Sequence, residues 1–262
     1  MNLTEEQIER YSRHIILQGV GGEGQEKILN AKVLIIGTGG LGAPAALYLA
    51  AAGVGTIGLI DGDTVDLSNL QRQVIHFTPD LDKPKVQSAK EKIAQINPDV
   101  NVNAMQDLFR ADNALDIIKD YDFIIDGTDN FPAKFLINDA CVMGKKPFSH
   151  GGILRFDGQT MTYVPGTASY RCVFDSPPPP NAVPTCSQAG VFGAIAGMLG
   201  TIQAAEALKF FINKGELLTN RLLIFDALTM KFRTVNVKPR PDRLNIEKLV
   251  DFDQAACDLK QS

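Results

Sequence analysis

The chain has 262 residues, of which 45% are hydrophobic, and this is enough for one large domain with a sizeable core. Its formal net charge is -4 and its pI is about 5.4, so the composition predicts no nucleic-acid partner and no anionic membrane surface as partner. The four cysteines form no C-x-x-C pair, and the acidic segment 1–17 does not resemble a signal peptide. We therefore expect a reduced, cytoplasmic protein without a disulfide framework.

The first half of the chain alternates between apolar strands and helices. In chain order, the predicted elements are a helix over 5–17, a strand over 33–36, an alanine-rich helix after the glycine turn 37–42, a strand over 56–60, a helix over 85–95, a strand over 100–105, a helix over 112–119 and a strand over 123–126. The strands are apolar on both faces, as a sheet covered by helices requires. This pattern predicts an α/β fold with a Rossmann-like, mainly parallel sheet and helices on both faces.

The pattern changes after about residue 147. Alternating residues over 158–164 predict an antiparallel strand, and the proline-rich run 176–184 predicts an extended loop. A long apolar helix is expected over 190–213. Its uncharged part is too short to span a bilayer, so we interpret it as a buried or dimer-interface helix. The segments 221–226 and 232–237 predict a closing hairpin, which completes a C-terminal antiparallel extension.

The glycine turn has the spacing of a nucleotide-binding βαβ unit. Gly37 permits the tight turn, Gly39 lets a phosphate approach the backbone, and Gly42 lets the helix pack closely on the strand. Phosphate is expected at the N–H groups that open the helix. Asp61 ends the next strand, 24 positions after Gly37, where it is placed to accept a ribose hydroxyl. The chain is therefore predicted to bind a nucleotide.

Polar residues after Asp61 favour ATP over NAD. Asn69, Gln71, Arg72, Lys83 and Lys85 follow it closely, and Asp129 lies at the end of another strand. The carboxyl ends of parallel strands meet in one crevice, where cations neutralise phosphates and a carboxylate holds magnesium. A P-loop is not present in the sequence. A NAD-dependent oxidoreductase remains an alternative.

At this point the sequence resembles the ThiF/MoeB/HesA branch of the ubiquitin-activating enzyme superfamily. The matching motifs are RYSRHIIL (10–17), GTGGLG (37–42), GLIDGDTVDLSNLQRQ (58–73), KPK (83–85), INP (96–98), DGTDN (126–130) and TCSQAGVFG (185–193). The resemblance implies ATP-dependent adenylation of the C-terminal glycine of a ubiquitin-like sulfur-carrier protein, with release of pyrophosphate. The carrier would be ThiS-like or MoaD-like and carry a Gly-Gly C-terminus, in thiamine or molybdopterin biosynthesis.

The resemblance also implies how the chain is organised. It divides a single adenylation domain, 1–262, into an N-terminal helix 4–18, a nucleotide-binding core 31–150, a carrier-binding and C-terminal part 151–240 and a polar tail 241–262. A rhodanese-like domain is not expected within this sequence. The sulfur donor is therefore expected to be a separate protein, either a cysteine desulfurase or a rhodanese-like protein.

Residue roles follow from the matching motifs. Nucleotide contacts are implied for Gly39, Gly40, Gly42, Asp61, Asn69, Gln71, Arg72, Lys85, Asp129 and Asn130. Arg72 and Lys85 would stabilise charge on the phosphates, and Asp129 would bind the magnesium that accompanies ATP. Asn130 would contact the nucleotide or shape the loop.

Two further residues have implied catalytic roles. Arg13 would reach the γ-phosphate in the partner subunit, which predicts a homodimer with two composite sites. Cys186 precedes the apolar helix and is either a reactive thiol towards the carrier or a buried or merely exposed thiol. The remaining thiols and imidazoles are interpreted as structural or incidental: Cys141, Cys257, His14, His76 and His150.

The sequence departs from its relatives at a structural zinc site. Two C-x-x-C pairs would be required, but Ser169 stands where the first pair needs a thiol beside Cys172, and the stretch 238–244 has no cysteine. We predict no zinc, and we expect direct packing between 165–175 and the C-terminal region instead. Two alternatives stay open: a related adenylase with a tRNA or peptide acceptor, and a catalytically idle scaffold.

Overall fold

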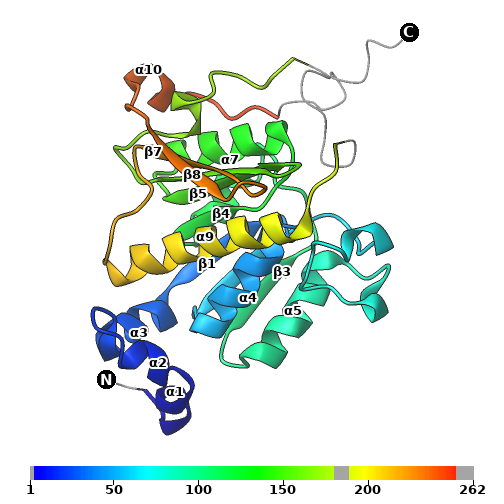
Figure 1. Cartoon of the computed structure of the whole chain (residues 1–262), viewed down its shortest axis with the longest axis vertical. Helices are drawn as coiled ribbons and strands as arrows, with labels where there is room; N and C mark the ends of the chain where they lie inside the picture. Colours follow the sequence, from blue (N-terminus) through cyan, green and yellow to red (C-terminus); the bar gives the residue numbers. More distant parts are fainter. Residues whose placement is uncertain (1–2, 180–188, 252–262) are drawn as a thin grey trace.

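One eight-stranded sheet runs through the part of the chain that the computed structural model describes, residues 3–179 and 189–251 (Figure 1). The strands are β1 (Lys32–Ile36), β2 (Thr56–Ile60), β3 (Asn101–Met105), β4 (Phe123–Asp126), β5 (Phe148–Leu154), β6 (Asp157–Tyr163), β7 (Arg221–Asp226) and β8 (Lys231–Asn236). Their spatial order is β3-β2-β1-β4-β5-β6-β7-β8, parallel from β3 to β5 and antiparallel from β5 to β8. The predicted parallel sheet with an antiparallel extension is confirmed.

Helices cover both faces of the sheet, as predicted. They are α1 (Glu5–Arg10), α2 (Ser12–Ile15), α3 (Gly21–Asn30), α4 (Gly42–Ala52), α5 (Lys85–Ile96), α6 (Ala114–Ile118), α7 (Phe131–Met143), α9 (Gly193–Ile212) and α10 (Pro241–Leu244). Successive side chains of a strand point to opposite faces. In β1, Val33 and Ile35 join the core under α4, α5 and α9, whereas Leu34 and Ile36 join the core under α6 and α7. Figure 1 shows α4, α5 and α9 in front of the sheet and α7 behind it.

The N-terminal segment departs from the prediction of one helix over 5–17. The helix breaks at Tyr11, which is 2% exposed because its ring packs against Gly53 and its hydroxyl accepts a 2.8 Å hydrogen bond from Asn97. The chain then forms α3, which begins within the glycine-rich stretch 19–24 and extends to Asn30. A Cβ on Gly24 would lie 3.0 Å from Val20 and 3.4 Å from Ile212 of α9, so glycine fits the space between these two side chains. Glycine here serves packing between helices, which the pattern alone did not reveal.

Helix α9 is buried on one face, as predicted. Its length and composition would allow it to cross a bilayer, but its buried polar residues Gln203 and Glu206 contact the sheet. The amide of Gln203 donates to the carbonyl oxygens of Asp126 and Ser149, and the carboxylate of Glu206 accepts from the hydroxyl of Thr162. These bonds attach α9 to β4, β5 and β6. A role of its outer face in a dimer interface stays a prediction.

The C-terminal region packs on the segment 165–175, as expected. Asp175 pairs with Arg240 at 2.8 Å and with Arg243 at 3.3 Å, while Phe174 and Leu244 join the same apolar core. Cys172 contacts Ser169 at 3.9 Å. Within residues 3–179 and 189–251, no three His, Cys, Asp or Glu side chains gather as metal ligands. The absence of zinc from the whole protein stays a prediction.

Candidate active site

A cleft of about 250 Å³ lies at the carboxyl ends of β1, β2 and β4. Its wall combines the glycine turn, the segments that follow β2 and β4, and the beginning of α5. The predicted site residues that line it are Gly39, Gly40, Asp61, Arg72, Lys85, Asp129 and Asn130. The structure therefore brings together residues from four separate segments, at the edge where open α/β sheets bind ligands.

The glycine turn has the predicted geometry. Gly37 has φ of +88°, and a Cβ on Gly42 would overlap the carbonyl oxygen of Gly37, so both positions require glycine. In the described residues, the N–H groups of Gly39, Gly40 and Leu41 donate no hydrogen bond. These donors lie at the start of α4, where the helix dipole favours an anion. The turn therefore suits phosphate oxygens.

Asp61 ends β2 with its carboxylate directed by the turn. Its Oδ2 accepts the N–H of Thr38 at 2.8 Å and the hydroxyl at 3.0 Å, while Oδ1 accepts the N–H of Asp63 at 2.9 Å. A carboxylate offers about four lone-pair sites, so at least one remains for a ligand. Asp61 is half-buried and lines the cleft, which is consistent with the predicted ribose contact.

Two cations line the cleft. Lys85 begins α5 and is buried, and its ammonium lies 2.8 Å from the exposed carboxylate of Asp63. Arg72 donates to the carbonyl oxygen of Ser68 at 3.0 Å. Each of the two cations can bind phosphate oxygens once a phosphate replaces this one contact. Asp63 was missed by sequence reasoning, although its place two residues after Asp61 is the signal that would have found it.

Asp129 and Asn130 follow β4 and lie side by side in the cleft wall. Asp129 is exposed and makes no hydrogen bond or ion pair with the other residues described here. Asn130 caps α7, because its Oδ1 accepts the N–H of Ala133 at 2.9 Å. Its side chain therefore shapes the loop, and a contact of Asn130 with the nucleotide stays a prediction. A solvated carboxylate that lines the same cleft as two cations fits a magnesium ion bound with a polyphosphate.

Some site residues differ from expectation. Gln73 was not predicted, yet it lines the cleft, is 4% exposed, and its Oε1 has no partner in the described residues. By contrast, Asn69 and Gln71 lie outside the cleft wall. The Asn69 side chain accepts from the N–H of Asp66 to close a short 3₁₀ turn, and Gln71 is exposed. Gln71 and Gln73 both lie next to Arg72 in the sequence, so only the burial of Gln73 in the structure distinguishes the two.

Arg13 lies at the opposite end of the subunit from the cleft. It is exposed on α2, next to Tyr11, which packs against Gly53 at the far end of α4. Helix α4 begins at the cleft and rises about 16 Å over its eleven residues. A direct contact of Arg13 with its own cleft is therefore not part of this structure. Action in the partner subunit stays a prediction.

The other candidate residues have the following positions. His76 and His150 are buried and hydrogen-bonded, and burial lowers the pKa of both imidazoles. Burial raises the pKa of the Cys141 thiol, which fits a structural role in the core of α7. Cys186 and Cys257 lie outside the described residues.

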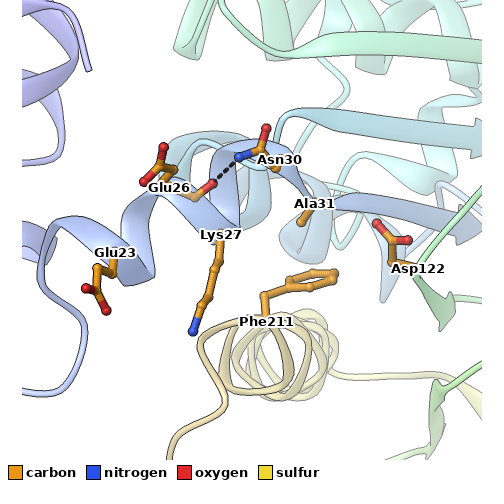
Figure 2. Close-up of a pocket in the computed structure, with 7 residues that line it drawn as sticks. All are labelled: Glu23, Glu26, Lys27, Asn30, Ala31, Asp122 and Phe211. Atoms are coloured by element: carbon orange, nitrogen blue, oxygen red, sulfur yellow. Dashed lines mark hydrogen bonds between the residues drawn. The ribbon is translucent and has the colours of Figure 1, made fainter. Parts of the chain in front are cut away.

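A second hollow, of about 490 Å³, lies between α3 and the end of α9 (Figure 2). Figure 2 shows Glu23, Glu26 and Lys27 around an open space next to Phe211. Asp122 already accepts the backbone N–H of Lys32 at 2.9 Å. The hollow has neither a glycine turn nor a pair of convergent cations in its lining. Its chemistry therefore does not compete with the cleft as a phosphate site.

Comparisons with known proteins agree with this geometry. A model of the ThiF family matches residues 11–246. The probable adenylyltransferase/sulfurtransferase MoeZ of Mycobacterium tuberculosis is 46% identical, over 96% of this chain and 66% of MoeZ, so the chain spans slightly less than two thirds of that relative. The sulfur carrier protein adenylyltransferase of Thermus thermophilus is 42% identical over 99% of this chain and 100% of that protein. The structure of E. coli MccB with AMPCPP and MccA has a TM-score of 0.79 at 26% identity, over 92% of this chain and 74% of MccB.

Proposed function

The chain belongs to the ThiF family, and on this premise we propose that it is an ATP-dependent adenylyltransferase for a ubiquitin-like sulfur-carrier protein. The observation that carries the proposal is that a glycine turn with unused N–H groups meets Arg72, Lys85 and Asp129 in one cleft. The similarity to the Thermus sulfur carrier protein adenylyltransferase, which extends over both whole chains, supports the acceptor class.

The proposed reaction needs little proton transfer. The carboxylate of the carrier's C-terminal glycine attacks the α-phosphorus of ATP, an acyl–oxygen–phosphorus bond forms, and the bond to pyrophosphate breaks. Catalysis then depends on positioning and on stabilising negative charge. The N–H groups of Gly39 and Gly40 hold phosphate oxygens, Arg72 and Lys85 balance the charge that develops, and Asp61 orients the ribose. Bound magnesium would neutralise phosphate charge, and Asp129 is the residue that would hold it.

Finer parts of the function are also proposals. The carrier is ThiS-like or MoaD-like, so the product serves thiamine or molybdopterin biosynthesis, and a separate protein supplies sulfur. Arg13 completes the site of a partner subunit in a cytoplasmic homodimer, in line with its position far from its own cleft. Mixing Arg13→Ala with Asp129→Ala subunits tests this arrangement. Recovery of activity in the mixture supports action in the partner subunit. If the subunits are shown to exchange and activity does not recover, the result argues against it.

A peptide acceptor is the second candidate. The observation in its favour is the likeness to MccB, whose structure contains AMPCPP and MccA. MccB is 26% identical to this chain, whereas the Thermus sulfur carrier protein adenylyltransferase is 42% identical to it. We therefore rank a carrier protein first.

ATP–pyrophosphate exchange tests the function directly. The purified protein is incubated with labelled pyrophosphate and ATP, with and without ThiS-like or MoaD-like carriers. Exchange that requires one carrier, and disappears when its terminal Gly-Gly is removed, establishes adenylation and names the partner. Exchange with a peptide instead selects the second candidate. ATP binding without exchange for any acceptor contradicts the proposed function.

A further inference from the structure

The carboxylate that the proposed function places on magnesium has no contacts that fix its position. Asp129 makes no hydrogen bond or ion pair within the described part of the chain, but both of its neighbours are anchored. Thr128 donates its N–H at 3.1 Å and its hydroxyl at 2.7 Å to Oδ1 of Asp126, and Asn130 caps α7. The place of Asp129 in the cleft is therefore set by the residues on either side.

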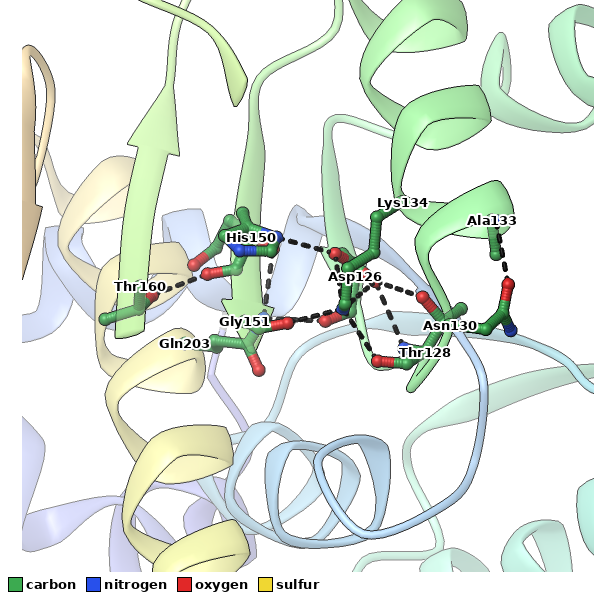
Figure 3. Close-up of polar contacts among 10 residues, drawn as sticks. Asp126, Thr128, Asn130, Ala133, Lys134, His150, Gly151, Thr160 and Gln203 are labelled. Carbon is green, nitrogen blue, oxygen red and sulfur yellow. Dashed lines mark hydrogen bonds and ion pairs between the residues drawn. The ribbon is translucent and has the colours of Figure 1, made fainter. Parts of the chain in front are cut away.

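Lys134 connects these anchors from within the protein (Figure 3). Its side chain is 7% exposed and that of Asp126 is 1% exposed. The Lys134 ammonium lies 3.1 Å from Oδ2 of Asp126 and donates to the carbonyl oxygens of Thr128 at 2.7 Å and Gly151 at 2.5 Å. One cation thus joins the end of β4, the loop 127–130 and strand β5.

His150 completes the environment of the Asp126 carboxylate. Its Nδ1 lies 2.9 Å from Oδ2 of Asp126, and its buried Nε2 has no partner in the described residues. Since a carboxylate oxygen can only accept, Nδ1 carries the hydrogen and Nε2 carries the lone pair. Burial lowers the pKa of His150, so the imidazole stays neutral. Lys134 is therefore the cation that balances the charge of Asp126.

We propose that Lys134 is a positioning residue, which holds the loop 127–130 against β5 so that Asp129 faces the bound nucleotide. This inference rests on the proposed function for the role of Asp129. A buried ion pair is a poor means of stabilising a fold, because desolvation offsets most of its attraction. Lys134 contributes something an apolar residue lacks, namely two bonds to carbonyl oxygens on segments that border the cleft. Loss of outer contacts of this kind weakens a metal site without removing its ligand.

The same helix offers a matched control. Arg171 pairs with Asp139 of α7 at 2.6 Å and 2.8 Å and donates to the carbonyl oxygen of Asp175. The Asp139 side chain is 5% exposed, and neither Asp139 nor Arg171 lines the cleft. Arg171→Met therefore breaks a largely buried ion pair between the segment Tyr170–Cys172 and α7 without touching the loop 127–130. Any effect shared by Arg171→Met and Lys134→Met comes from general destabilisation.

The first measurement is amide hydrogen exchange on the protein without nucleotide. In Lys134→Met, the amides of Gly127 and Thr128 should exchange roughly tenfold faster, as expected when one hydrogen bond's net contribution is lost. They should be unchanged in Arg171→Met and close to wild type in Lys134→Arg, which keeps the charge and the donors. Equal exchange at these amides in wild type and Lys134→Met overturns the proposal.

The second measurement is the magnesium dependence of ATP binding. In Lys134→Met, the magnesium concentration for half-maximal binding should rise about 10- to 100-fold, the range typical of outer contacts at a metal site. If ATP binding by the wild-type protein depends on magnesium and Lys134→Met has the same magnesium requirement, the proposal is overturned. If the wild-type protein itself binds ATP without regard to magnesium, the assignment of Asp129 fails, whereas loop exchange still decides whether Lys134 holds the loop.

If Lys134→Met does not fold, the combined variant Lys134→Met with Asp126→Asn replaces it. Removing both charges together avoids an unpaired buried ion, which is the costly outcome. The combined variant should show the same faster loop exchange and higher magnesium requirement. If the combined variant folds and has wild-type loop exchange and a wild-type magnesium requirement, the proposed role of the pair is refuted.

Discussion

Two aspartates at the carboxyl ends of the strands on either side of β1 have opposite environments. Asp61 directly follows β2, and Asp126 is the last residue of β4. Each carboxylate accepts the N–H and the hydroxyl of one threonine, Thr38 or Thr128. Asp61 is half-buried and lines the cleft, whereas Asp126 is 1% exposed and contacts a lysine and a histidine.

The difference shows that the neighbours of a strand-end carboxylate decide its role. Asp61 keeps accepting capacity in a solvated cleft and is suited to bind a ligand. Asp126 has five contacts with protein donors against the three of Asp61, and it is suited to hold the backbone in place. Three residues after Asp126, Asp129 takes the exposed position instead. We therefore expect variants to separate a structural carboxylate from two binding carboxylates.

The largest expected effect is on stability, from Asp126→Asn. The change leaves the buried Lys134 ammonium without a counter-charge, and breaking a buried pair in this way costs about 3–5 kcal/mol of unfolding free energy. Urea denaturation measures the loss. Asp61→Asn is the matched control, since its solvated position should limit the change to about 1 kcal/mol. Similar losses for both variants would contradict the distinction between the two strand ends.

The next effect is on activity, from Asp129→Ala. Because this carboxylate makes no contacts in the described structure, its removal should leave the unfolding free energy within about 0.5 kcal/mol of wild type. Exchange of pyrophosphate should fall by about 10²–10³-fold, the loss typical of one preorganised electrostatic group. Measured together, exchange and denaturation distinguish it from Asp126→Asn. Near-normal turnover would remove Asp129 from the magnesium site.

A third effect is the pH dependence of the Asp126 contribution. Burial alone would raise the pKa of Asp126, but the charge of Lys134 and the His150 hydrogen bond outweigh burial and lower it from 3.8 to about 2. A lowered folded-state pKa gives stability above the unfolded pKa and loses it as the pH falls towards the folded pKa. The stability difference between wild type and Asp126→Asn should therefore shrink by about 2 kcal/mol between pH 5 and pH 2. A constant difference over this range would contradict the lowered pKa.

The sequence predicted the parts of the molecule that depend on local pattern. β2 and β4 have the predicted bounds, and the glycine turn has the predicted tight turn at Gly37, because apolar runs and glycine spacing are local signals. β5 was missed, since Gly151 and Gly152 indicate a loop. A Cβ at Gly151 would lie 2.8 Å from Gln203, so glycine there admits α9.

The site residues too were predicted only where local sequence patterns indicate them. Asp61, Arg72, Lys85 and Asp129 were predicted to meet because they follow strand ends or belong to a motif, and all four line the cleft, while their roles stay predictions. The Lys134–Asp126 pair depends on burial and on contacts between segments, which spacing along the chain does not encode. Gln73 was missed for the same reason.

The smallest effect tests Asp61 as a ribose ligand. Asp61→Asn keeps an accepting oxygen for Thr38 but removes the charge that strengthens a hydrogen bond to a ribose hydroxyl. Wild type should bind ATP more tightly than 2′,3′-dideoxy-ATP. In the variant the ratio of the two affinities should fall about tenfold, which corresponds to the net contribution of one hydrogen bond. Competition binding of the two nucleotides measures this ratio without requiring turnover. Asp63→Asn is the control, because the Asp63 side chain contacts Lys85 rather than the turn, so its loss should change the binding of both nucleotides by the same factor. An unchanged ratio in Asp61→Asn would assign the carboxylate to holding Thr38, which would make Asp61 a structural residue like Asp126.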